Sequence, residues 1–148
     1  MKRLLFIASL MLCLFSVPLT GFAAPTEEEQ QKYEEAIADN MKDMLKGSIA
    51  LDKINAENKT SLLNWMDAES PSEDAKKTVE KILKLQEEQE KEQESLDPYT
   101  KARKACDEKL NADGANAALE NIIRIQKDRI EDQEEIKELW KKVNQLLK

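Results

Sequence analysis

Apolar residues in this 148-residue chain recur at alternate steps of three and four residues, and this spacing constrains the fold more than any other feature. Because an α-helix turns once every 3.6 residues, the repeat places these residues on one face of a helix in three successive segments. A disordered chain has no reason to space its few apolar residues so regularly. The repeat therefore predicts an all-α protein.

Composition alone gives two conflicting indications for residues 24–148. Ile, Leu and Val total 23 of these 125 residues and Phe is absent, which is typical of a disordered chain. Ala, Glu, Lys, Leu and Arg total 66 of the 125, which is typical of long helices and coiled coils. The regular spacing decides in favour of helices, held together by a thin apolar core.

The first predicted helix covers about residues 27–67. Thr26 and Glu29 form a capping box, in which each side chain pairs with the other residue's backbone amide at the helix start. Ser70 and Pro71 follow the last apolar position and end the helix. Its repeating positions are Ile37, Met41, Met44, Ser48, Leu51, Asn55, Asn58, Leu62 and Trp65.

The middle segment begins with Ser70 as the predicted N-cap and Pro71 in the first helical position. Its repeating positions are Ala75, Val79, Ile82, Gln86, Gln89, Gln93 and Leu96.

Pro98 interrupts this segment, because proline lacks an amide hydrogen and clashes with the preceding turn. Two alternatives are open: two helices, about 71–96 and 98–111 with Asp97 as the second cap, or one helix kinked at Pro98. Residues 111–114 are expected to close this segment.

The last predicted helix covers about residues 115–147 and carries the longest apolar face of the three. Its repeating positions are Leu119, Ile122, Ile123, Gln126, Ile130, Gln133, Ile136, Trp140, Val143 and Leu147.

The three segments correspond to rods of roughly 60, 60 and 50 Å at 1.5 Å per residue. Short connections force successive rods to lie antiparallel. We therefore expect a single domain that forms an elongated antiparallel three-helix bundle, with its middle helix kinked or broken at Pro98. The alternative is an extended helical hairpin or coiled coil that oligomerises through its exposed faces.

Residues 1–23 are typical of a cleaved secretory signal peptide. A positive start at Lys2 precedes an apolar stretch, and small residues up to Ala23 predict cleavage before Ala24. Pro18 limits the apolar helix to fewer than the ~20 residues that a bilayer span requires. We therefore expect an exported protein, periplasmic or secreted, with no stable membrane span after cleavage.

Cleavage makes the chain more acidic. Of the 23 basic residues only Lys2 and Arg3 belong to the signal, so 21 basic residues face 30 acidic ones and the net charge is −9. Such a balance argues against nucleic acid, whose phosphates require a basic surface, and against anionic membranes. A protein partner or a second copy of the chain is expected instead.

Cys106 is the single cysteine after the signal, because Cys13 lies within it. An intramolecular disulfide is therefore impossible, while an intermolecular disulfide through Cys106 is possible in an oxidising compartment. The alternative is a small buried residue, because Cys106 shares helical spacing with Tyr99, Ala102 and Leu110.

The sequence offers little chemistry. Histidine is absent, which removes the commonest general base, and one cysteine cannot form a thiolate zinc site. Gly47 and Gly114 are too far apart in the sequence for a phosphate-binding loop. We therefore predict no enzyme activity, no catalytic residues and no cofactor.

A calcium loop is the closest match to a metal site. Asn111, Asp113, Gly114 and Glu120 occupy ligand or turn positions of an EF-hand, but Lys109 stands where the first carboxylate belongs. A helix C-cap at Gly114 explains the same residues, so no metal is predicted.

The repeating faces are polar in their middles, with Asn and Gln at several positions. These amides either pair with one another, or they leave a weak central region that a partner helix or unfolded client enters. The candidate interaction residues are Met41, Met44, Leu51, Leu62, Trp65, Ile122, Ile136 and Trp140.

The leading hypothesis is an exported non-catalytic helical binding protein, adaptor or chaperone-like, that acts through amphipathic helix faces. The alternative is a self-assembling structural or surface coiled-coil protein of the cell envelope. A third class, an enzyme or ligand sensor, would require a formed pocket with perturbed carboxylates.

Overall fold

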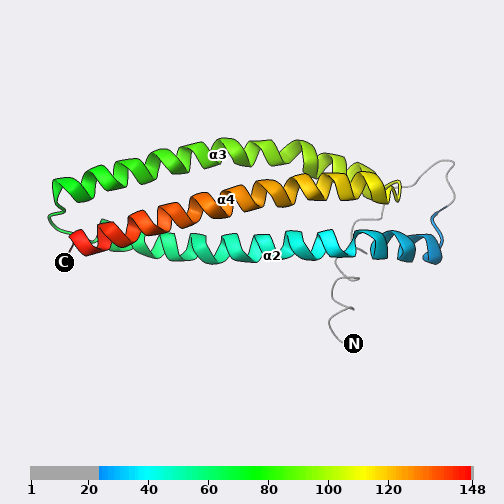
Figure 1. The fold of residues 1–148 in the computed structure, drawn as a ribbon, viewed down its shortest axis with the longest axis horizontal. Helices are drawn as coiled ribbons and strands as arrows, with labels where there is room; N and C mark the ends of the chain where they lie inside the picture. Colours follow the sequence, from blue (N-terminus) through cyan, green and yellow to red (C-terminus); the bar gives the residue numbers. More distant parts are fainter. Residues whose placement is uncertain (1–23, 148) are drawn as a thin grey trace, which may run out of the picture.

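The structure is a computed structural model that describes residues 24–147, and it contains three long α-helices. They are α2 (Glu27–Met66), α3 (Glu73–Asp107) and α4 (Ala112–Leu146), and no strand occurs within the described residues. Figure 1 shows successive helices running antiparallel along one long axis. The protein is an all-α, elongated antiparallel three-helix bundle, as the sequence predicts. The predicted signal peptide, with Cys13, lies outside the described residues.

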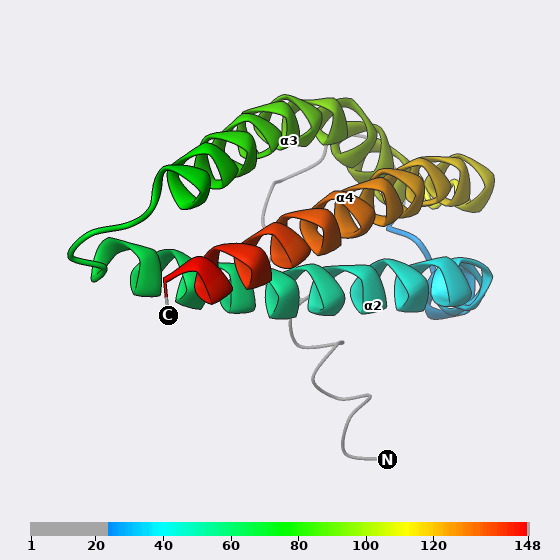
Figure 2. The same cartoon turned by 60° about the vertical axis from the view of Figure 1, so that its left-hand side comes forward.

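Helix α4 is the centre of the bundle. It packs against both α2 and α3, whereas α2 and α3 have no close backbone contact with each other. The apolar content agrees with this arrangement, because α4 contributes eight buried apolar side chains while α2 contributes four and α3 three. Figure 2 shows α3 arched over α4 with α2 on the other side.

Helices α2 and α3 each begin directly after a residue whose side chain caps the helix. The predicted capping box is present, since Thr26 Oγ1 accepts from the Glu29 amide at 3.2 Å and Glu29 Oε2 accepts from the Thr26 amide at 2.9 Å. Helix α3 begins two residues later than predicted, because Ser72 is its N-cap and accepts from the Ala75 amide at 3.2 Å. The predicted cap, Ser70, therefore lies in the connection.

Helix α3 runs without a break through Pro98. The alternative of two helices, 71–96 and 98–111 with Asp97 as a cap, is therefore wrong. Pro98 is exposed at the edge of a groove between α3 and α4, and the helix continues through it without the one hydrogen bond that proline cannot donate.

The connection between α3 and α4 also differs from the prediction. Helix α3 ends at Asp107, and Leu110 adopts a left-handed conformation with φ of 50° that reverses the chain. Asn111 then caps α4, because its Oδ1 accepts from the Gly114 amide at 3.1 Å. Residues 111–114 therefore begin the last helix and do not close the middle one.

Two apolar clusters hold the helices together. The Trp140 cluster has a core of Val79, Ile82, Ile136, Trp140 and Val143, flanked by Leu62 and Trp65 of α2. The Tyr33 cluster has a core of Tyr33, Ile37, Ala115 and Leu119, flanked by Cys106 of α3. All three helices contribute to each cluster.

Candidate functional site

The eight predicted interaction residues face the interior of the bundle. Leu51, Ile122, Ile136 and Trp140 are buried. The other four are half-buried and pack against the two clusters: Met41, Met44, Leu62 and Trp65. These residues stabilise the fold, and a partner would reach the buried ones only by separating the helices.

An amide layer of Asn58, Gln89 and Gln133 lies among the inner faces, with one residue from each helix. Asn58 Nδ2 donates to Gln133 Oε1 at 2.7 Å and to the Gln133 carbonyl at 3.2 Å. Gln133 Nε2 in turn donates to Gln89 Oε1. All three side chains are at least nine-tenths buried. The amides therefore pair with one another across the bundle, as the first of the two sequence alternatives has it.

Two other amides predicted on inner faces are exposed, Asn55 and Gln93. Ile54 is buried where Asn55 was expected. Ile54 lies three residues after Leu51 and four before Asn58, so position 54 also keeps the helical spacing of the inner face. Ile54 is buried in place of Asn55 because burying an apolar side chain is favourable.

Gln126 of α4 approaches α2 closely at Gly47. Gln126 Nε2 donates to Ser48 Oγ at 3.0 Å. A Cβ atom at position 47 would lie 2.6 Å from Gln126 Oε1, so the glycine makes room for this side chain. The close approach accounts for a glycine in a helix interior, where it otherwise lowers stability.

Tyr33 and Asp107 join α2 to the end of α3. The Tyr33 hydroxyl donates to Asp107, which also lies 3.4 Å from Arg103 Nε in an ion pair. Cys106 is half-buried and free, and a Cβ atom at Gly114 would lie only 2.6 Å from its Sγ. Cys106 therefore packs against Gly114 and the Tyr33 cluster, and the intermolecular disulfide stays a prediction.

Burial, together with the hydrogen bond to Asp107, raises the pKa of Tyr33 above its ordinary value of about 10. The folded state therefore favours the protonated phenol. The contribution of the protonated Tyr33 to the free energy of unfolding is fully present below pH ~10 and is lost as the pH rises further. We expect wild type to lose more stability than Tyr33→Phe between pH 9 and pH 11 in urea unfolding at each pH. Parallel losses in the two proteins would contradict this assignment.

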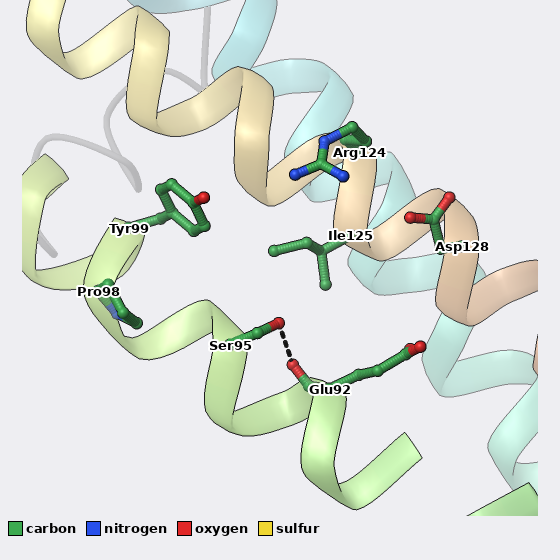
Figure 3. Close-up of a pocket in the computed structure, with 7 residues that line it drawn as sticks. All are labelled: Glu92, Ser95, Pro98, Tyr99, Arg124, Ile125 and Asp128. Carbon is green, nitrogen blue, oxygen red and sulfur yellow. Dashed lines mark hydrogen bonds between the residues drawn. The ribbon is translucent and has the colours of Figure 1, made fainter. Parts of the chain in front are cut away.

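An open groove lies between α3 and α4 beside Pro98. Its volume is about 460 Å³, and Figure 3 shows Tyr99 and Ile125 pointing into the space between the helices. Burial, followed by repulsion from Asp132 and Asp128, raises the pKa of Glu92 at its edge. Ser95 uses its hydroxyl to donate to the Glu92 carbonyl at 2.5 Å. The groove follows from the arch of α3. Asp128 at its edge is exposed, whereas Glu92 is half-buried and its Oε2 is buried without a hydrogen-bond partner within residues 24–147.

A second apolar face runs along the solvent side of α2. Its large apolar residues are exposed to 47% at Leu45, 69% at Ile49, 53% at Leu63 and 69% at Met66. The face follows its own repeat of alternate four- and three-residue steps, distinct from the inner face. We call it the outer face of α2, and it consists of Leu45, Ile49, Asp52, Ala56, Lys59, Leu63 and Met66, all exposed.

Sequence reasoning missed this face because it assigned one apolar face to each helix. The signal was present, since the steps 45, 49, 52, 56, 59, 63 and 66 can be read directly from the sequence. Tyr33 was also missed, although it lies one four-residue step before Ile37.

Within residues 24–147, no helix combines the length and the hydropathy needed to cross a lipid bilayer. The same part of the chain contains no group of three or more Asp, Glu or Cys side chains placed to bind a metal ion. Asn111, from the calcium-like motif, instead caps α4.

Comparisons of the chain with protein-family models, with curated protein sequences and with solved structures find no match.

Proposed function

We propose that this chain, once exported to the periplasm or secreted, is a non-catalytic helical binding protein of the adaptor or chaperone-like kind. Its docking surface is the outer face of α2. The observation that carries the proposal is the exposure of four large apolar side chains on one helical face of a protein whose apolar residues are scarce.

The geometry of this face suits another helix. Leu45 and Met66 are 21 residues apart, which corresponds to about 32 Å along α2 and three heptads. A helix with a matching apolar face would pack along it as in other helix-recognition surfaces. Leu45 with Ile49 and Leu63 with Met66 form two exposed apolar pairs, one toward each end of the face, and grouped apolar exposure is typical of interaction sites.

The groove beside Pro98 and the amide layer support binding over catalysis. The groove beside Pro98 is open, and the rise in the Glu92 pKa follows from burial and neighbouring acids. The amide layer is internal and its members bond to one another. Neither feature provides the converging acid, base and nucleophile that a reaction requires.

Photocrosslinking in the producing cells tests the proposal. A photoreactive residue in place of Ile49 is expected to give discrete protein adducts, because a docked helix lies against that side chain. Mass spectrometry of each adduct identifies the attached protein and the attached peptide.

Glu87 provides the control position, because it is exposed on α3 and lies away from the outer face of α2. The same probe at Glu87 should give few adducts. Equal yields at the two positions, or no adducts at Ile49, would remove the outer face of α2 as a docking surface.

A further inference from the structure

The order of apolar, charged and small residues along the outer face of α2 is nearly symmetric about Ala56. Ile49 and Leu63 lie seven residues on either side of Ala56, while Leu45 and Met66 lie eleven before and ten after it. Apolar residues therefore occupy both ends of the face, and a small residue occupies its centre. A surface with this symmetry is complementary to itself when a second copy is reversed in direction.

Charges strengthen the pattern. Asp52 lies four residues before Ala56 and Lys59 lies three after it, so opposite charges occupy equivalent places in the two halves. Both side chains are exposed, and neither forms an ion pair within residues 24–147. They are therefore available to a second molecule.

We propose that the outer face of α2 binds α2 of a second copy in antiparallel orientation, centred on Ala56. This proposal rests on the proposed function, because it names the helix that occupies the docking surface. The pairing is two-fold symmetric, and it places Asp52 of each copy beside Lys59 of the other at two equivalent points. Leu45 and Ile49 of one copy then meet Met66 and Leu63 of the other.

The charge pattern excludes the parallel arrangement in the same register. Parallel pairing would place Asp52 against Asp52 and Lys59 against Lys59, and like charges at close range destabilise a helix pair. Antiparallel pairing converts both repulsions into attractions.

The local charge balance also permits two copies to approach. Residues 42–66 carry four lysines against three acidic residues, although residues 24–148 as a whole have a net charge of −9. Most acidic residues lie outside this range, so long-range repulsion between two copies is weak along the outer face of α2.

Sedimentation of the purified protein with charge-reversal variants tests the pairing. Wild type is expected to form dimers. Asp52→Lys and Lys59→Asp should each weaken dimerisation by roughly 10- to 30-fold, because each places two like-charged contacts in the interface. The double variant Asp52→Lys with Lys59→Asp restores both attractions and should return the dissociation constant to near that of wild type.

Disulfide trapping tests the direction and register. In a Cys106→Ala background, a protein with Leu45→Cys is mixed with a protein with Met66→Cys and oxidised. The mixed disulfide should dominate, because the two copies of position 45 lie about 30 Å apart in the antiparallel pair. Leu45→Cys mixed with Glu94→Cys, which lies on α3, serves as the matched control.

The outcomes separate this proposal from the proposed function. A folded monomer at all concentrations, or a dimer indifferent to both charge reversals, would overturn the self-pairing. If photocrosslinks at Ile49 then attach to other proteins, the outer face of α2 remains a docking surface with a different occupant. If those crosslinks are also absent, both proposals fail.

Discussion

Replacing Trp140 by alanine is expected to lower the free energy of unfolding by about 3–5 kcal/mol. Trp140 is 1% exposed, the largest of the fully buried side chains, and it lies in the cluster that joins α3 and α4 with Leu62 and Trp65 of α2 against it. Its removal leaves a cavity that the surrounding helices fill only partly by relaxing. Urea unfolding followed by circular dichroism measures the loss.

Trp65→Ala provides the comparison, because Trp65 flanks the same cluster but is only half-buried. Its expected loss is smaller, about 1–2 kcal/mol, in proportion to the apolar area removed from water. Equal losses for the two tryptophans, or a loss below about 1 kcal/mol for Trp140→Ala, would show that the Trp140 cluster does not hold the bundle together.

Replacing Gln133 by alanine is expected to lower the free energy of unfolding by about 2–4 kcal/mol. Gln133 bonds to both Asn58 and Gln89, so its removal leaves two buried amides without those partners. Asn58 Oδ1 and Gln89 Nε2 already have no hydrogen-bond partner within residues 24–147, so the substitution adds further unpaired amide groups to the layer. Urea unfolding at neutral pH gives the value.

The variant with leucine at all three positions of the amide layer provides the control. It removes every polar group from the layer while keeping similar volume, so its stability should equal or exceed that of wild type. If Gln133→Ala and the triple leucine variant lost stability equally, the loss would come from packing and not from unpaired amides.

Helix content and inner faces could be predicted because they depend on local spacing. The repeat from Ile37 to Trp65 placed buried and half-buried residues correctly except at Asn55, where neighbouring Ile54 is buried. The capping box at Thr26 was also predicted, since both of its partners lie within one turn.

The remaining differences concern the start of α3 and its course through Pro98, where the local sequence permits more than one structure. Ser70 and Ser72 are both acceptable caps, and the acidic residues Glu73 and Asp74 next to Ser72 favour the later start. For Pro98 both a broken and a kinked helix were open, and only the broken one is wrong, because α3 continues through Pro98 as one helix. Neither outcome can be read from the apolar spacing alone, because both serines fit the start of the repeat and the spacing does not say whether a helix continues through a proline.

The repeat that forms the outer face of α2 is visible in the sequence, but its exposure to solvent could not be predicted from the sequence. A second repeat on α2 is visible in the sequence, yet two repeats on one helix do not say which faces α4. Burial settles the question, since Leu51 and Ile54 are covered while Ile49 and Leu63 are exposed. The residues predicted to bind a partner consequently face the interior of the bundle, four of them buried and four half-buried.

The central claim is that α2 uses its inner face for folding and its outer face for association. The most direct measurement is the concentration dependence of the thermal midpoint for wild type and for Ile49→Glu combined with Leu63→Glu. Association stabilises the folded state by mass action, so the wild-type midpoint should rise with concentration. The midpoint of the double variant should stay constant and equal the wild-type midpoint at high dilution. Identical concentration dependence in the two proteins, or a lower midpoint for the double variant at high dilution, would contradict the claim.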